Sequence, residues 1–300
     1  MTDHIVGLHI CPQQVRAITL QRIDRDYRLL ALDEFPMKFP GSLHDPADPD
    51  PPSRELASAL NAFVHGAAVR PKTVGITFDA AFLFISAIPT EPRMQTDALE
   101  QRVAWELSQY FPDVQRDRFI ADMHVIANPG AQTYDEMLVV AVRRELTRSV
   151  RRAIEGAGFI VGVVDADHFS TELTLKVNYP DTYSRYVALV GVKDSRMDVS
   201  LLRNGVLESY RYHQLRSRGD AVQTLGTISR DTPGLASIVV YGPALDNTLL
   251  VQLRQASAIV VEALNPLRHI AVAESVQLAE SVNSPPYRFA PAIGVALRRD

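Results

Sequence analysis

Residues 5–20 read IVGLHICPQQVRAITL, and residues 186–202 read YVALVGVKDSRMDVSLL. Each stretch consists of an apolar strand, a short polar turn and a second apolar strand. After the second copy, Asn204-Gly205 turns the chain into a third strand, because Asn-Gly is a favoured dipeptide of tight hairpins. A repeat of this kind fixes the architecture, and it predicts two lobes of similar construction.

The apolar spacing around the repeat predicts a mixed α/β fold, in which groups of strands alternate with helices. In the first half we expect helices near 53–64, 97–110 and 144–155, and strands near 4–10, 15–23, 27–35, 73–78, 82–88, 119–126, 136–142 and 159–164. In the second half we expect helices near 167–180, 219–228, 245–256 and 291–297, and strands near 186–192, 198–203, 206–212, 237–241 and 260–261. The dense prolines from Pro36 to Pro52 predict an exposed extended loop, and Asn128-Pro129-Gly130 predicts a hairpin tip.

Bulk composition excludes several classes of protein. A chain of 300 residues with 46% hydrophobic content can bury substantial cores and suggests two domains. A net charge of −4 argues against a dedicated nucleic-acid binder, which usually carries a basic face. The single cysteine, Cys11, allows neither an internal disulfide nor a cysteine zinc cluster, which fits a reducing cytoplasm. The sequence offers no apolar run of about 20 residues for a membrane span, and Met1–His4 does not resemble the start of a signal peptide.

Short motifs beyond the repeat follow one another along the chain: AWELSQYFP at 104–112, VAVRREL at 140–146, AGF at 157–159 before VD at 164–165, LLRNG at 201–205, NPL at 265–267 and RFAPAIGVAL at 288–297. In their residues and in their order along the chain, they resemble the motifs of the PilM proteins of type IV pilus assembly. The resemblance covers nearly the whole chain and implies an actin-like (ribonuclease H-like) α/β fold of two lobes. It implies a first lobe at 1–165 with an inserted subdomain at about 82–142, and a second, abbreviated lobe at 166–300.

The same resemblance shows which chemistry is missing. In the actin-like fold ATP lies between the lobes, and each repeated turn offers glycine N–H groups to phosphate and an aspartate to Mg²⁺. Here the two aspartate positions hold His9 and Gly191, and the two glycine positions hold Cys11 and Lys193. Only Gly242 remains of the glycine triplet that usually contacts adenosine. We therefore expect no cofactor, although weak binding of ATP with Mg²⁺ stays an alternative.

A further difference from PilM proteins concerns the second lobe. Their helical insertion forms one wall of the nucleotide cleft, whereas about 25 residues separate Tyr212 from Ser237 in this chain. This length allows one helix, so the insertion is expected to be reduced or missing. We predict a vestigial nucleotide cleft, without catalytic residues or metal, at His9, Cys11, Gln13, Gln14, Gly191, Lys193, Asp194, Ser195 and Gly242.

Each unusual cleft residue has an ordinary and a functional interpretation, and we favour the ordinary one. Lys193 and Asp194 could contact an anion, but we expect turn residues that face water. His9 could be a metal ligand or a base, but a neutral packed histidine is favoured because no second histidine or cysteine lies at ligand spacing. Cys11 could be a nucleophile, but an inert buried thiol is favoured.

Two surfaces are candidates for binding a partner or lipid: Trp105, Tyr110 and Phe111 on the helix near 97–110, and the basic face Arg144, Arg148, Arg151 and Arg152. We expect the arginines to form a solvated face, with attraction to anionic lipid or to an acidic partner as the alternative. Trp105 lies off the stripe of Leu99, Val103 and Leu107, and we expect it to pack in a core instead of acting as a binding anchor.

The resemblance implies a non-catalytic cytoplasmic scaffold that lies at the inner membrane only through its partners. Its first lobe would bind the N-terminal tail of PilN, a bitopic membrane protein, within a platform of other pilus proteins. The helix at 97–111 and the strand Phe82–Ile88 are the candidate walls of that groove. The alternatives are a secretion component like the cytoplasmic part of GspL, a weak ATPase, and a sugar-kinase-like enzyme.

Overall fold

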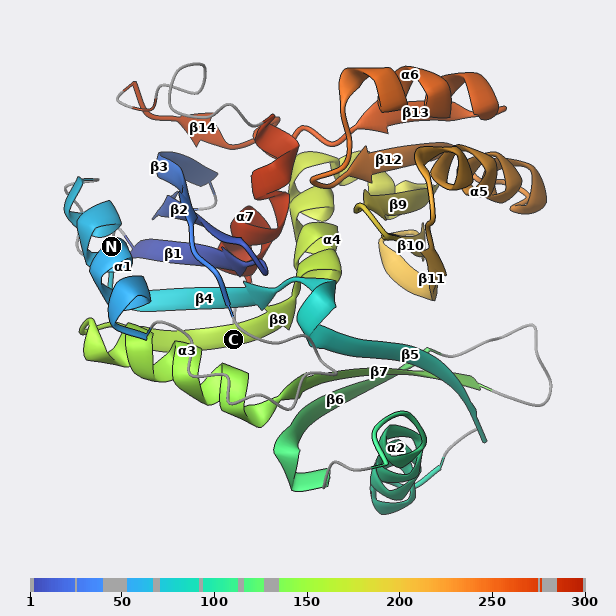
Figure 1. Ribbon diagram of the computed structural model, residues 1–300. Helices are drawn as coiled ribbons and strands as arrows, with labels where there is room; N and C mark the ends of the chain where they lie inside the picture. Colours follow the sequence, from blue (N-terminus) through green and yellow to red (C-terminus); the bar gives the residue numbers. More distant parts are fainter. Residues whose placement is uncertain are drawn as a thin grey trace.

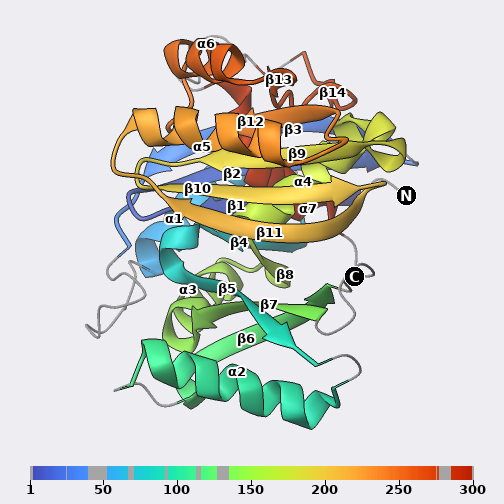
Figure 2. The same ribbon diagram turned by 90° about the vertical axis from the view of Figure 1, so that its right-hand side faces the viewer.

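The structure is a computed structural model of the chain, and it describes residues 3–24, 26–39, 53–66, 71–91, 94–112, 116–126, 135–274, 276 and 285–298. Two lobes lie side by side, each built on a twisted sheet, and a smaller three-stranded sheet extends from the first lobe (Figures 1 and 2). The mixed α/β architecture with two similar lobes is therefore confirmed.

The first lobe is built on a six-stranded sheet in the order β14-β3-β2-β1-β4-β8. Its strands are β1 (Asp3–Ile10), β2 (Gln14–Ile23), β3 (Asp26–Pro36), β4 (Thr73–Phe78), β8 (Ile160–Ala166) and β14 (Ala271–Val272). Helices α1 (Ser53–Gly66) and α3 (Arg144–Gly156) cover one face, and α7 (Ala290–Leu297) packs on the other. Because both faces of its centre are covered, β1 is apolar on both sides.

The second lobe repeats this topology in a five-stranded sheet, β11-β10-β9-β12-β13. Its strands are β9 (Tyr186–Val192), β10 (Arg196–Arg203), β11 (Val206–Gln214), β12 (Ser237–Tyr241) and β13 (Val260–Ala263). In each lobe, three antiparallel strands precede two parallel ones. The hairpin residues Asn204 and Gly205 have φ of +54° and +76°, which is the left-handed geometry that a type I′ turn requires. The internal duplication predicted from the repeat is thus present.

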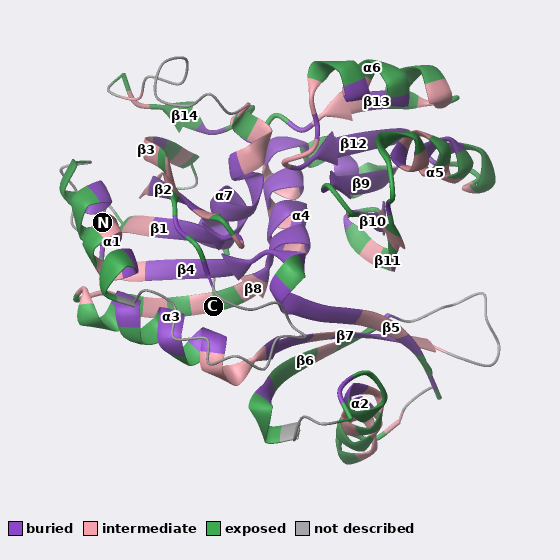
Figure 3. Cartoon of the chain, in the orientation of Figure 1, coloured by how far each residue is buried: buried purple, intermediate pink, exposed green. Residues whose placement is uncertain are grey.

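Three helices complete the second lobe. Helices α5 (Arg218–Asp231) and α6 (Asn247–Ala256) pack on one face of its sheet. Helix α4 (Asp167–Asn178) packs on the other face and lies between the two lobes, where most of it is buried (Figure 3). Between β11 and β12 the chain forms α5 alone, so the helical insertion is reduced to one helix.

The inserted subdomain consists of a three-stranded sheet, β5-β7-β6, and one helix. Its elements are β5 (Leu83–Thr90), α2 (Thr96–Tyr110), β6 (Phe119–Ile126) and β7 (Asp135–Arg143). Val103 and Leu107 of α2 pack on one face of this sheet, against Phe84 and Val139. The opposite face of β5 and β7 joins the core of the first lobe.

The arrangement of the elements differs from the predicted one at two places. The loop after β3 begins inside the core, since Met37 and Phe39 are buried against Phe82, so this part of the predicted exposed loop is wrong. Residues 40–52 and the predicted hairpin tip at 128–130 lie outside the described residues. The predicted second lobe, 166–300, also includes segments that return to the first lobe, because β14 pairs with β3 and α7 packs on β1.

Two glycines allow α7 to lie unusually close to its neighbours. A Cβ atom on Gly7 of β1 would overlap the carbonyl oxygen of Ala292 in α7. A Cβ atom on Gly294 would overlap the carbonyl oxygen of Ser170 in α4. Helix α7 is therefore packed closely between the first-lobe sheet and the helix that connects the lobes.

We expect Gly294→Ala to lower the free energy of unfolding by about 3 kcal/mol, the upper end of the usual cost of overpacking. Chemical denaturation measures this change. Gly156→Ala is the matched control, because a Cβ atom there would meet nothing within 4 Å. This control should be neutral or slightly stabilising. Equal losses for both variants would contradict the close approach of α7.

Candidate functional site

A cleft of about 730 Å³ lies between the lobes, where the two repeated turns face one another. The predicted cleft residues that line it are Cys11, Gln13, Gln14, Lys193, Asp194 and Ser195. His9, Gly191 and Gly242 lie behind this surface and are buried. The fold therefore brings the two turns together at one site, although its deepest contacts involve residues that the sequence did not single out.

Lys193 forms the floor of the cleft. Its side chain is buried, with 8% of the residue exposed. Its Nζ atom lies 2.6 Å from Oδ2 of Asp167, 3.5 Å from Oδ2 of Asp79 and 3.6 Å from Oδ2 of Asp198. The prediction that Lys193 faces water is wrong, whereas its neighbour Asp194 is exposed as expected. The lysine turns inward because three carboxylates converge there.

The electrostatics of this cluster keep the lysine charged. Burial opposes the ammonium, but the carboxylates of Asp167, Asp79 and Asp198 outweigh this effect and raise the pKa of Lys193. Burial also raises the pKa of Asp167, against the charge of Lys193. Burial acts in the same direction on Asp198, yet Lys193 and Arg196 prevail and lower its pKa to about 2. At neutral pH the cluster therefore contains an ammonium and an ionised Asp198.

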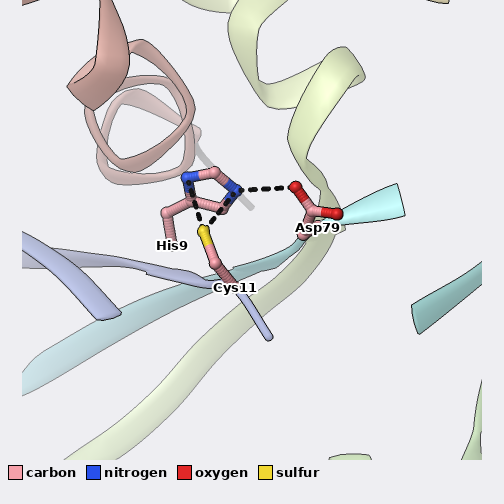
Figure 4. A group of neighbouring side chains, drawn as sticks. All are labelled: His9, Cys11 and Asp79. Atoms are coloured by element: carbon pink, nitrogen blue, oxygen red, sulfur yellow. Dashed lines mark hydrogen bonds and ion pairs between the residues drawn. The ribbon is translucent and has the colours of Figure 1, made fainter. Parts of the chain in front are cut away.

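His9, Cys11 and Asp79 lie close together at the ends of β1 and β4 (Figure 4). Cys11 Sγ is 3.5 Å from His9 Nε2, which is 4.0 Å from Asp79 Oδ2. These are zinc-ligand types. However, Arg16 Nη1 lies 3.4 Å from Cys11 Sγ and 3.5 Å from His9 Nδ1, and Lys193 lies at Asp79. Because two cationic side chains already contact the three ligand atoms, we assign no metal to this group.

Burial also determines the protonation of His9 and Cys11 at the first turn. It lowers the pKa of His9, and the charges of Arg16 and Lys193 lower it further. Burial raises the pKa of the Cys11 thiol, and the opposing charge of Arg16 does not reverse this. His9 is thus a packed neutral histidine and Cys11 a buried thiol, as favoured from the sequence.

Packing leaves no room for a side chain at two glycines of the cleft. A Cβ atom on Gly191 would come within 2.8 Å of the Tyr241 hydroxyl. Gly242 has φ of +122°, and a Cβ atom there would overlap the backbone of Val192. Their presence is explained without any contact to phosphate or adenosine.

A buried polar network joins α4 to the second sheet. His168 Nδ1 lies 2.9 Å from the Tyr241 hydroxyl, and His168 Nε2 lies 3.0 Å from Ser200 Oγ. Ser200 donates a 2.5 Å hydrogen bond to Glu172. The side chains of this network are enclosed, so they stabilise the contact of α4 with the sheet and reach no substrate.

The sequence analysis missed this network and the three aspartates of the lysine cluster. Two signals could have found them. His168 and Glu172 have i, i+4 spacing, and Asp198 and Ser200 have i, i+2 spacing in an otherwise apolar strand, so each pair shares a face. Asp79 and Asp167 each follow a parallel strand, and such strand ends meet at one edge of a sheet.

The aromatic residues of α2 have separate environments. Trp105 is 51% exposed and Tyr110 is 54% exposed, whereas Phe111 is buried. The prediction of core packing for Trp105 is wrong, because only the stripe through Val103 and Leu107 contacts the sheet. Tyr110 and Phe111 line the cleft and Trp105 does not.

The basic face of α3 is largely solvated, as favoured. Arg148, Arg151 and Arg152 are exposed, and Arg151 pairs with Glu155 at 2.7 Å. Arg144 instead donates to the backbone carbonyl groups of residues 117 and 119, which fixes the start of β6 against α3. Arg144 is therefore structural, and the exposed three remain candidates for a surface contact.

Comparison with known proteins gives the family. The model of the type IV pilus assembly protein PilM family matches residues 7–219. This chain belongs to the PilM family. A search of curated proteins found no match. The family places the chain in type IV pilus assembly, as the motifs and the two-lobed fold indicated.

Solved structures confirm the fold. A PilM–PilN type IV pilus biogenesis complex contains a chain that is 19% identical, with a TM-score of 0.74, over 98% of this chain and 97% of that one. A Bacteroides thetaiotaomicron protein with an actin-like ATPase fold and unknown function is 12% identical, with a TM-score of 0.50, over 88% and 91%. The cytoplasmic domain of EpsL, an inner-membrane component of the Vibrio cholerae type II secretion system, is 11% identical, with a TM-score of 0.51, over 98% and 94%. The fold is therefore actin-like.

The actin-like fold implies a magnesium nucleotide between the lobes, and the residues of this cleft do not fit one. Lys193 Nζ takes the position among three carboxylates where a hard cation would find its oxygen ligands. Pro12, at the first turn, has no N–H group to offer to phosphate. As to membranes, none of the helices among the described residues has the length and apolar character of a membrane span.

We expect Glu172 to lower the melting temperature as the pH rises from about 5 to about 8, and the buried His9 and His168, whose pKa values are lowered, to act in the opposite direction below about pH 6.5. Burial raises the pKa of Glu172 from 4.5 to about 7, against the hydrogen bond from Ser200. In this range the folded state holds a proton that the unfolded state has released, so stability is complete below the unfolded pKa and is lost as the pH rises through about 7. Asp167 acts in the same direction.

Thermal melts over this pH range test the assignment. Glu172→Gln removes this contribution, so its melting temperature relative to that of the wild type should rise from pH 5 to pH 8, whereas Glu55→Gln, at an exposed position of α1, should keep a constant difference from the wild type. A constant difference for Glu172→Gln as well would show that Glu172 is ionised in the folded protein and would contradict the prediction.

Proposed function

We propose that this chain is a non-catalytic scaffold of a type IV pilus assembly platform, and that it holds the cytoplasmic tail of a PilN-like inner-membrane protein. The observation that carries the proposal is the buried Lys193, which occupies the centre of the cleft where a nucleotide-bound cation would lie. Family membership supplies the biological setting. The chain would then lie at the inner membrane through this partner and contact other platform proteins there.

The cleft is poor in the groups that nucleotide chemistry requires. Catalysis of phosphate transfer depends on a metal ion and on donors aimed at the phosphate oxygens. The aspartates that could hold a metal are bound to Lys193, and they present negative charge toward any phosphate. Burial lowers the pKa of His9, which makes it a weak proton acceptor, and raises the pKa of Cys11, which keeps it a thiol, so neither is an effective base or nucleophile. This supports the proposed absence of catalysis.

A groove for the partner's tail continues from the cleft along the inserted subdomain. Residues 83–86 of β5 form one wall, and Tyr110 and Phe111 at the end of α2 form the next. In the described part of the chain β5 is an edge strand that pairs only with β7. An extended peptide can add to such an edge through backbone hydrogen bonds, with its alternate side chains in apolar pockets. Both candidate walls named from the sequence thus meet at one groove.

The occupant that fits this groove is an extended, partly apolar peptide. Leu83, Phe84 and Ile85 line the groove with small exposed parts of otherwise buried apolar side chains, and the exposed Tyr110 ring lies 5.0 Å from that of Phe84. The structurally similar PilM chain was solved in complex with PilN. We therefore propose the N-terminal tail of a PilN-like protein as the ligand of this groove.

We expect Tyr110→Ala to weaken binding of the tail about tenfold, since exposed aromatic anchors carry much of the energy of such interfaces. The ligand is the N-terminal peptide of a PilN-like protein encoded beside this chain, and fluorescence anisotropy measures the dissociation constant. Trp105→Ala is the matched control, because Trp105 is equally exposed on the same helix and does not line the groove. Its affinity should equal that of the wild type.

Two outcomes would contradict the proposal. If the peptide does not bind at high micromolar concentration, the PilN-like tail is not the ligand of the groove. Binding that is weakened by Trp105→Ala and not by Tyr110→Ala would place the tail elsewhere on the helix. Neighbouring genes that encode other components of a secretion system, with no PilN-like gene beside this chain, would favour the secretion alternative.

We expect Mg-ATP at millimolar concentration to leave the melting temperature of the wild-type protein unchanged within about 1 °C. A ligand that binds only the folded state must raise the melting temperature by mass action. Differential scanning fluorimetry measures the shift, with Mg²⁺ alone as the control. A rise of several degrees with Mg-ATP alone would favour the weak ATPase.

A further inference from the structure

The contacts of Lys193 cross the boundary between the lobes. The lysine follows β9 in the second lobe, whereas Asp79 follows β4 in the first lobe, and their charged atoms are 3.5 Å apart. Asp167 begins the helix that lies between the lobes, and Asp198 lies on β10 in the second lobe. One ammonium therefore holds carboxylates from three separate parts of the fold.

Lys193 acts here as a point charge. Among the described residues its Nζ atom is buried and has no well-directed hydrogen bond, although three carboxylate oxygens lie within 3.6 Å of it. Oδ2 of Asp198 likewise has no hydrogen-bond partner there and faces this charge. Oxygen ligands from several elements around one positive centre are the usual surroundings of a hard metal ion.

We propose that Lys193 is a built-in cation that takes the place of a metal ion between the lobes and keeps the lobes closed in the absence of nucleotide. The inference rests on the proposed lack of nucleotide chemistry and is independent of which partner binds the groove. It gives the lysine a conformational role: without its charge, Asp79 and Asp167 at the end of the first-lobe sheet would repel Asp198 of the second lobe across the lobe boundary. It also implies that the three aspartates form a latent site for a divalent cation once the lysine is removed.

Replacement of the lysine tests both parts. In EDTA, Lys193→Ala should lower the melting temperature by roughly 5 °C or more, because it leaves Asp79 and Asp167 without their cationic partner, whereas Asp198 keeps Arg196. Millimolar Mn²⁺ should restore most of this loss in Lys193→Ala and should leave the wild type unchanged. The double variant Lys193→Ala/Asp79→Asn should lose the response to Mn²⁺, because one ligand of the latent site is gone.

Two matched controls separate this effect from loss of any charge. Lys72→Ala removes an exposed lysine of the first lobe. Arg211→Ala removes an exposed ion pair that also links the lobes, in which Arg211 Nη1 lies 2.9 Å from Glu136 Oε2. Because exposed pairs contribute little, both variants should melt close to the wild type and should not respond to Mn²⁺.

Small-angle X-ray scattering reads the lobe arrangement directly. Nucleotide-free wild type should match the closed structure, Lys193→Ala in EDTA should be more extended, and Mn²⁺ should close it again. If Lys193→Ala does not fold, Lys193→Met keeps the length of the side chain and removes its charge. The inference is overturned if the wild type is open without nucleotide, or if folded variants are as stable and as compact as the wild type in EDTA.

The tail peptide distinguishes this inference from the proposed function. Wild type that binds the peptide while its Lys193 variants remain closed would refute the built-in cation and leave the scaffold intact. If the wild type binds no peptide while the Lys193 variants open and respond to Mn²⁺, the built-in cation would be supported and the proposed binding of the tail would be refuted.

Discussion

The interaction on which the rest of the structure depends is the buried ion-pair cluster of Lys193 with Asp79, Asp167 and Asp198. Burying charges is costly, and a cluster of this kind is tolerated only when every charge has a partner. Removing one partner from a buried pair typically costs about 3–5 kcal/mol. Because the four residues come from both lobes and from the helix between them, this penalty requires the strand ends of both sheets to meet in one arrangement.

The duplicated fold persists because its close contacts do not depend on nucleotide. Gly191 makes room for Tyr241, and Gly242 makes room for Val192, so the second turn keeps its shape without phosphate. Gly7 and Gly294 let α7 approach its neighbours in the same way. Mutations that remove phosphate contacts therefore leave the packing intact, whereas mutations at these glycines would disrupt it.

The fold could be predicted from the sequence because apolar periodicity and turn residues report local structure. The repeated strands and the Asn204-Gly205 hairpin depend on neighbours in sequence, and their positions were correct within a few residues. Lys193 could not be placed in this way, since a lysine beside Asp194 in a polar turn has the local pattern of a solvated residue. Its partners are distant in sequence, and only the fold shows that three carboxylates converge on it. Trp105 was misplaced because one face of α2 contacts a sheet and the helix has no second neighbour to bury its other side.

A covalently attached cation has a consequence that a metal ion lacks. A nucleotide with its metal can bind, react and leave, so it can bias a protein between two conformations. Lys193 cannot leave, because it is covalently part of the chain, and its effective concentration at the three carboxylates is therefore constant. A scaffold closed in the proposed way would have one arrangement of its lobes, and the groove beside β5 would keep one shape. Under the proposed function, occupancy of that groove would be set by the concentration of the partner's tail and by its affinity, without control by a nucleotide cycle.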